Sequence, residues 1–219
     1  MALRKHSPFK FTPIRVGIVV VLVLMGILST YILTSLLASN QQEVISNGED
    51  ISYVVPREAT GFQKQCYDEL KVAINSDSTT EQYGLDVSSA IVKNYIADFY
   101  TWSNKLGSQD VGGLQFVYGP SIQNIYEFAR AYFYHDLSYL ISQYGSDNLL
   151  KVNSVTIKNV AYAGNVTINS TSYQSYYIEV SWTYESSTDL EVSTYQNHGN
   201  FSLLVNENGR YEIYRYYTE

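Results

Sequence analysis

The first part of the chain beyond residue 50 has hydrophobic residues at helical spacing. In residues 61–74 this period follows Thr60 and Gln63, which match an N-terminal capping box. The pattern predicts a short helix whose core side includes Cys66. After a Ser/Thr/Asp-rich loop at 75–84, a second helix is predicted from an N-cap at Asp86 to about residue 104.

A third, longer helix is predicted from Ser121, as its cap, to the stop signal at Gly145. At 100° per residue, one wide side of this helix is apolar. It includes Phe133 and Leu137.

After residue 148 the hydrophobic period changes to two, which is typical of strands. Residues 176–184 alternate cleanly, and residues 150–162 change phase twice, which indicates bulges that bend a sheet. Asn208-Gly209 predicts a type I′ hairpin between strands near 191–206 and 210–217.

That hairpin pairs Leu203 with Tyr214 and Phe201 with Tyr216. The fold class predicted for the whole chain is therefore α+β: an N-terminal transmembrane helix, then helices packed on one face of a curved antiparallel sheet.

Residues 16–38 are the predicted transmembrane helix. This stretch has 23 residues without a charge, which at about 1.5 Å per residue reach about 35 Å, enough to cross a bilayer core. A cleaved signal peptide is the alternative, but its apolar region is shorter and ends in a small-x-small site. Leu36-Leu37-Ala38 does not supply such a site, so an uncleaved anchor is favoured.

Charge around this segment predicts its orientation. Residues 1–15 carry four basic and no acidic side chains, whereas residues 39–58 contain Arg57 as their one basic residue. The positive-inside rule then places the N-terminus in the cytoplasm, and the protein is expected to be a single-pass protein of the cell membrane. We expect a basic cytoplasmic tail (1–15), a linker (39–50) and an extracytoplasmic α+β domain (51–219).

Beyond residue 15 the chain holds 10 basic and 21 acidic side chains, a net charge of −11. Because such a surface repels phosphate, nucleic-acid binding is not expected. His6, His135 and His198 lie far apart in the sequence and Cys66 is the lone cysteine. This spacing predicts no metal site and no cofactor.

The order of helices and bent strands resembles the nuclear-transport-factor-like (cystatin-like cone) superfamily. With the short basic tail and single span, the layout is similar to the bitopic scaffold proteins of bacterial conjugation and type IV secretion. The resemblance covers residues 1–219 in topology and about 85–219 in pattern. It implies a cone-like domain, and the superfamily includes enzymes, ligand binders and scaffolds.

Three charged residues are candidates for a ligand pocket. Asp136 falls about 40° from the centre of the apolar side of the third helix, and Asp98 and Arg130 fall about 80° from the centres of theirs. A carboxylate there is costly unless it is paired. The three either line a pocket between helices and sheet, as an acid, a base or a clamp for a ligand carboxylate, or form structural hydrogen bonds and ion pairs.

Tyrosine is unusually frequent, with 22 of 219 residues. The tyrosines either form an interface on an exposed sheet face or replace phenylalanine in the core. The leading hypothesis is a non-catalytic, membrane-anchored module that binds a protein partner or itself in a bacterial envelope assembly. The alternative is a small-ligand or enzymatic pocket that uses Asp136, Arg130 and Asp98.

Overall fold

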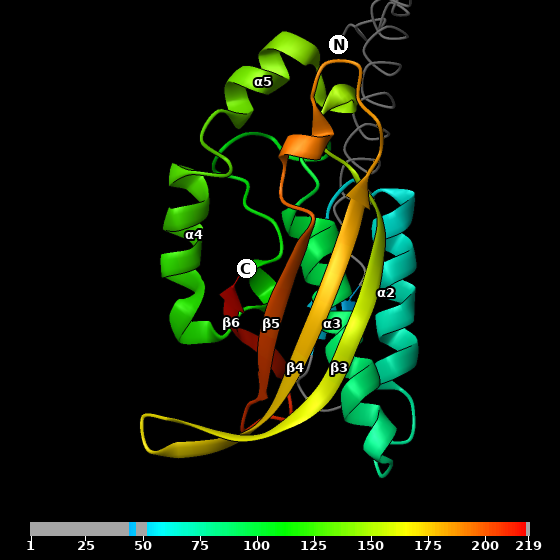
Figure 1. Cartoon of the computed structure of the whole chain (residues 1–219), viewed down its shortest axis with the longest axis vertical. Helices are drawn as coiled ribbons and strands as arrows, with labels where there is room; N and C mark the ends of the chain where they lie inside the picture. Colours follow the sequence, from blue (N-terminus) through cyan, green and yellow to red (C-terminus); the bar gives the residue numbers. More distant parts are fainter. Residues whose placement is uncertain (1–43, 47–51, 218–219) are drawn as a thin grey trace, which may run out of the picture. The chain divides into compact units, whose positions relative to one another are not determined.

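A four-stranded antiparallel sheet in the order β3-β4-β5-β6 is the centre of the fold (Figure 1). In this computed structural model the described residues are 44–46 and 52–217, which belong to the unit Glu43–Glu219. The predicted tail at 1–15 and the transmembrane helix at 16–38 lie outside them. Within residues 44–46 and 52–217, no helix has both the length and the apolar character needed to cross a membrane.

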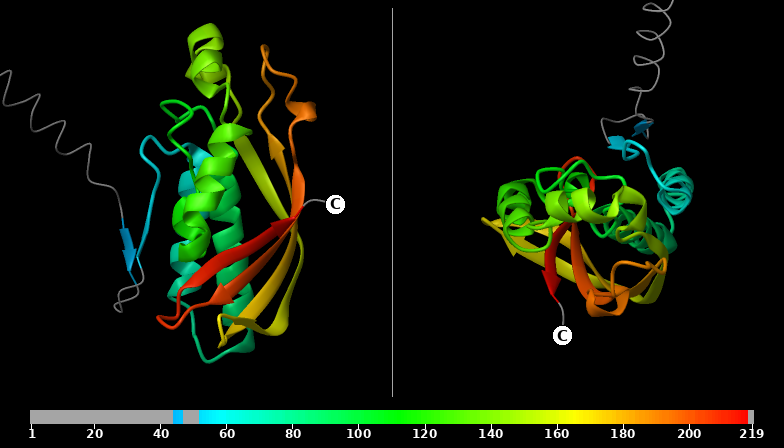
Figure 2. Two further views of the ribbon diagram at one scale, coloured as in Figure 1. Left: turned by 90° about the vertical axis from the view of Figure 1, so that its left-hand side faces the viewer. Right: turned by 90° about the horizontal axis from the view of Figure 1, so that it is seen from above.

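The helices precede the sheet in the sequence, as predicted. They are α2 (Gly61–Ile74), α3 (Glu81–Phe99), α4 (Ile122–Ala131) and α5 (Leu137–Tyr144), with 3-10 turns at Leu114–Phe116, Gly119–Ser121, Ser146–Asn148 and Val192–Thr194. The strands of the main sheet are β3 (Val152–Ile168), β4 (Thr171–Tyr184), β5 (His198–Val205) and β6 (Tyr211–Tyr217). Helices α2, α3 and α4 lie on one face of this bent sheet (Figure 2). The α+β class with helices on a curved antiparallel sheet is confirmed.

Two short strands precede the helices. Strand β1 (Val44–Ser46) pairs with β2 (Ser52–Val54), so part of the expected linker at 39–50 is a strand. The guanidinium of Arg210 donates to the carbonyls of Ser52 and Gln115 at 2.8 and 2.6 Å. It also lies 4.4 Å from the centre of the Tyr53 ring. One side chain thus holds β2 and the 114–116 turn to the start of β6.

The first two helices are close to their predicted positions. Thr60 and Gln63 form the capping box of α2, and Cys66 is buried, as expected. Helix α3 begins six residues before the expected site, because Thr80 caps it in place of Asp86, accepting from the Tyr83 amide at 3.3 Å.

The third helix is not continuous. Residues 132–136 separate α4 from α5, because Tyr134 turns inward and is fully buried. Its hydroxyl donates to the Phe99 carbonyl at 2.6 Å and accepts from the Gly112 amide at 3.2 Å. Ser121 makes no side-chain cap, whereas Gly145 ends α5 as predicted.

The sheet confirms the predicted bulges and corrects a turn. The register of β3 against β4 shifts at three places, between residues 152 and 154, 157 and 159, and 162 and 164. Asn169 and Ser170 both have positive φ, 49° and 69°, and form the two-residue β3–β4 turn that type I′ geometry describes. At the predicted I′ site, Gly209 has a φ of 74° and Asn208 is not among the residues with positive φ.

The β5–β6 turn is a three-residue loop. The Gly209 amide donates to the Asn206 carbonyl, and the Asn206 amide donates to Arg210, both at 2.9 Å. The longer loop pairs Leu203 with Ile213, so the predicted pairing with Tyr214 is wrong, and the register shift between Leu203 and Ser202 then restores the predicted register. The predicted pair of Phe201 with Tyr216 is confirmed.

The core lies between α3 and the sheet. Alternate residues of β4, from Tyr176 through Ile178 and Val180 to Trp182, are buried against it, as the period of two predicts. Some tyrosines pack in the core, which is one of the two expected alternatives, and others are exposed on helices and turns as well as on the sheet. Those buried below a tenth of their surface are Tyr53, Tyr67, Tyr95, Tyr100, Tyr134, Tyr176 and Tyr211, and those well exposed are Tyr132, Tyr139, Tyr144, Tyr162 and Tyr217.

Gly84 tests the contact of α3 with the sheet. A Cβ at Gly84 would overlap the ring and hydroxyl of buried Tyr176. Although alanine favours a helix by about 1 kcal/mol over glycine, overpacking costs about 1–3 kcal/mol. We expect Gly84→Ala to lower the free energy of unfolding in urea titrations. Gly61→Ala, at a position with open space around its Cβ, is the control and should not lower it.

Candidate functional site

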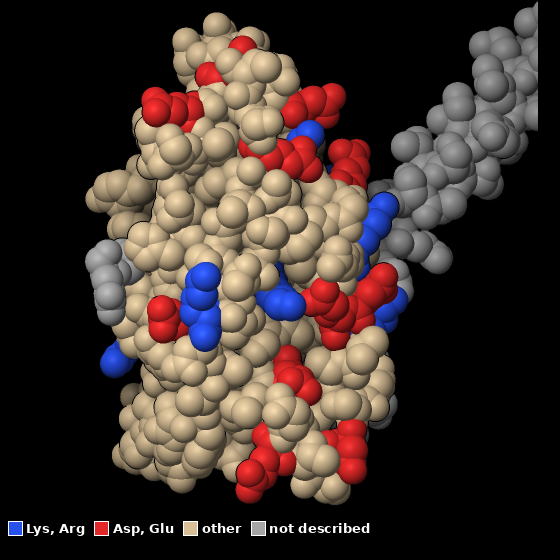
Figure 3. Space-filling view, turned by 45° about the vertical axis from the view of Figure 1, so that its right-hand side comes forward, with Lys and Arg blue, Asp and Glu red and all other residues tan. Residues whose placement is uncertain are grey.

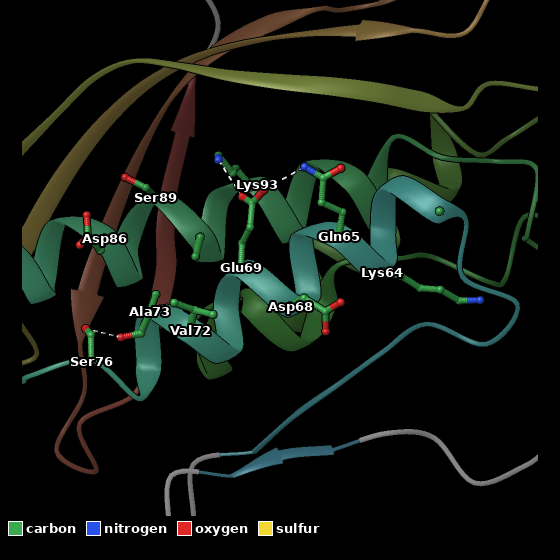
Figure 4. Close-up of a pocket in the computed structure, with 12 residues that line it drawn as sticks. Lys64, Gln65, Asp68, Glu69, Val72, Ala73, Ser76, Asp86, Ser89 and Lys93 are labelled. Carbon is green, nitrogen blue, oxygen red and sulfur yellow. Dashed lines mark hydrogen bonds and ion pairs between the residues drawn. The ribbon is translucent and has the colours of Figure 1, made fainter.

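A groove of about 740 Å³ runs between the outer surfaces of α2 and α3 (Figure 4). Glu69 of α2 and Lys93 of α3 meet across it at 2.8 Å, and Gln65 donates to Glu69 at 3.0 Å. Burial opposes ionisation of Glu69. The hydrogen bonds from Lys93 and Gln65 and the charge of Lys93 outweigh it and hold the pKa of Glu69 below its usual value.

Several polar groups of this groove are hydrogen-bonded to their neighbours. The hydroxyls of Ser76 and Ser89 donate to the carbonyls of Ala73 and Leu85, each at 2.7 Å, so neither hydroxyl is hydrogen-bonded to a base. Asp86 accepts from Gln82 at 2.7 Å. Ala73 and Ala90 also line the groove, with Val72 73% exposed at its side. The arrangement suits packing against an apolar side chain better than nucleophilic or acid–base chemistry.

Asp98 lies elsewhere, at the C-terminal end of α3, in a buried ion pair. One carboxylate oxygen is 2.5 Å from Lys105 Nζ, and the other accepts from the Gly113 amide at 2.7 Å. The two charged side chains are only 11% and 5% exposed. Gly113 has a φ of 75°, a conformation that favours glycine. This geometry ties the end of α3 to the loop that follows it.

Arg130 and Asp136 have other partners. Arg130 is 3.3 Å from Glu127, one turn away on α4, and lies over the Tyr126 ring. The Asp136 side chain is 71% exposed and is 2.7 Å from the equally exposed His135. The break between α4 and α5 removes the continuous helix on which Asp136 was expected to face the core.

The structure therefore does not join the three candidate residues. No hydrogen bond or ion pair among the described residues links any two of Asp98, Arg130 and Asp136, and none of them lines the α2–α3 groove. Sequence reasoning missed Lys105, the partner of Asp98. Its one signal was a lone lysine seven residues after Asp98 in a stretch with buried aromatic residues.

Aromatic rings fill the space between the end of α3, the 132–136 turn and the sheet. Phe133 stacks on Phe99 at 5.5 Å between ring centres and meets Tyr100 and Trp102 edge-on or tilted at 5.2 and 4.8 Å. Tyr100 in turn lies 4.6 Å from Trp182 of β4. Burial raises the pKa of Tyr100 and Tyr134 well above the usual value, so both hydroxyls stay neutral.

In the part of the chain that the structure describes, no group of three or more His, Cys, Asp or Glu side chains could hold a metal ion. Burial raises the pKa of the Cys66 thiol to about 12, which disfavours the reactive thiolate. Comparison of the chain with protein-family models, with curated proteins and with solved structures finds no match.

The separate environments of Asp98 and Asp136 predict different effects of mutation. Lys105→Met leaves the Asp98 carboxylate buried without its partner and should lower the free energy of unfolding by about 3–5 kcal/mol. Asp136→Asn, on an exposed side chain, is the matched control and should change it by less than about 0.5 kcal/mol. Urea denaturation of the two variants measures both. Equal effects would contradict the assigned environments.

Proposed function

We propose that this protein is a membrane-anchored, extracytoplasmic interaction module of a bacterial envelope assembly, without catalytic activity. Residues 16–38 anchor it in the cell membrane as a single pass, the N-terminus lies in the cytoplasm, and the acidic domain lies outside. The support for the anchor is the uncharged 23-residue sequence and the excess of basic residues before it. The cone-like superfamily resemblance remains part of the proposal.

Exposed apolar side chains at α4 and α5 carry the proposed binding role. The rings of Phe128 and Tyr132 are tilted against each other with their centres 4.6 Å apart, and the two residues are 65% and 70% exposed. Tyr139 of α5 and Leu106 are 62% and 72% exposed. The loop that contains Leu106 contacts α5, because the Ser108 amide donates to the Ser138 hydroxyl at 3.3 Å. We name these four residues the α4–α5 apolar surface. Such aromatic side chains provide contact area at low entropic cost.

The distribution of charge on another face of the molecule is compatible with this proposal. On the face shown in Figure 3, Lys, Arg, Asp and Glu lie in small groups, acidic beside basic in several places, on a largely uncharged surface. Because the aromatic rings occupy the space between helices and sheet, the groups available to a partner are those outside. For this reason we favour an interaction module over a pocket that uses Asp98, Arg130 and Asp136.

One crosslinking experiment tests both location and role. A membrane-impermeant, lysine-reactive crosslinker added to intact cells should link the full-length protein into larger products. Phe128→Ser combined with Tyr132→Ser should lower the yield of these products while the protein stays folded and abundant. Tyr217→Ser, at an exposed side chain at the end of β6, should keep them. An unreacted wild-type chain, or equal products from all three proteins, would contradict the proposal.

A further inference from the structure

The β3–β4 hairpin extends beyond the rest of the sheet. Strand β5 begins its pairing with β4 at Ser175, opposite Leu204. Residues 164–168 and 171–174 therefore pair only with each other, around the Asn169-Ser170 turn. This two-stranded segment, residues 164–174, is the β3–β4 arm, and in Figure 1 it runs out to the left below α4. A lone two-stranded hairpin is marginally stable in water, so added pairing would stabilise it.

The pairing of the arm determines which backbone amides and carbonyls of β3 point outward, away from β4. In a two-residue hairpin the residues that flank the turn, Ile168 and Thr171, form a hydrogen-bonded pair, and such pairs alternate along the ladder. Val166 and Ile168 thus direct their amides and carbonyls toward β4. Asn165 and Thr167 direct theirs away from β4, and no strand of the described residues pairs with this side of β3.

The arm lacks the features that protect the rest of this edge. Nearer the core, β3 carries Lys158 and register shifts on both sides of it, and charges and bulges prevent edge-to-edge pairing. From the last shift at Gly164 to the turn, the pairing is regular. No residue from Asn159 to Ile178 is charged. Residues 16–219 carry a net charge of −11, but this segment carries no charge that would repel the same segment of a second copy.

We propose that the partner of the β3–β4 arm is the same arm of a second copy of this chain. Two arms pair antiparallel along β3 about a two-fold axis at Val166. In this register Asn165 of each copy faces Thr167 of the other, so the outward amides and carbonyls match in four backbone hydrogen bonds. The two Val166 side chains then face each other as a non-hydrogen-bonded pair.

The contact is short, so association is weak in solution. It becomes effective where both copies are confined to one membrane, since tethering raises the local concentration. The effect of tethering rests on the proposed membrane anchor, and the inference adds that a second copy of this chain is a partner of the proposed interaction module. The pairing itself does not require the anchor.

A cysteine at the proposed axis reports the pairing directly. Opposed residues of a non-hydrogen-bonded pair have Cα atoms about 4.5 Å apart, within the range of a disulfide. The native thiol does not compete, because Cys66 is buried with a raised pKa. We expect full-length Val166→Cys in detergent to form a disulfide-linked dimer under mild oxidation, while Thr156→Cys, at an exposed position of the same strand, stays monomeric.

A second comparison separates pairing by the arm from association by the anchor. Thr167→Pro removes an outward amide and leaves the β3–β4 ladder intact, whereas Thr167→Val keeps the amide. In sedimentation velocity of the full-length protein at high concentration in detergent, we expect dimers of the wild type and of Thr167→Val, and their loss in Thr167→Pro. Far-UV circular dichroism checks that the fold is retained.

Two results would overturn the arm-to-arm contact. One is a Val166→Cys chain that links no faster than Thr156→Cys, and the other is a wild type that is monomeric or dimerises equally with proline at 167. Either result, together with products in the intact-cell crosslinking that depend on Phe128 and Tyr132, leaves the interaction module standing. The arm edge would then be open to a strand of a different protein.

Discussion

Aromatic packing at the C-terminal end of α3 holds the helical layer on the sheet. Phe99 contacts Tyr95, Tyr100, Phe133 and Tyr134 at ring-centre distances from 5.0 to 5.6 Å. Each such pair contributes about 0.5–1.5 kcal/mol beyond the burial of its area. Since these rings come from α3 and from the turn between α4 and α5, the same cluster sets where the third helix must break. The architecture around the sheet depends on this packing.

The break has a direct effect on what the protein can do. By turning Phe133 and Tyr134 inward, it packs aromatic rings between the helices and the sheet and leaves Asp136 in solvent. Asp98 is engaged with Lys105 in the loop below. The features left for recognition are external: the α4–α5 apolar surface, the α2–α3 groove and the β3–β4 arm. This distribution favours contacts with proteins over chemistry on a small molecule.

The sequence predicted what depends on local periods and missed what depends on tertiary contacts. The capping box of Thr60, the alternation of β4 and the bulges of β3 are local, and all are confirmed. Burial of Tyr134 overrode the helical period of 121–144, and no neighbouring residue marks that break. The expected position of Asp136 rested on that period, so Asp136 was misplaced together with the helix. The I′ turn was assigned to Asn208-Gly209, because Asn169-Ser170 lacks glycine.

Quenching of tryptophan fluorescence by acrylamide tests most directly whether aromatic rings fill the interior. The two tryptophans of the chain, Trp102 and Trp182, both lie in the aromatic cluster and are 3% and 2% exposed. A filled interior predicts blue-shifted emission and slow quenching in the full-length protein, both lost in denaturant. Quenching in the native state as fast as in the denatured chain would show a water-filled cavity and contradict the account.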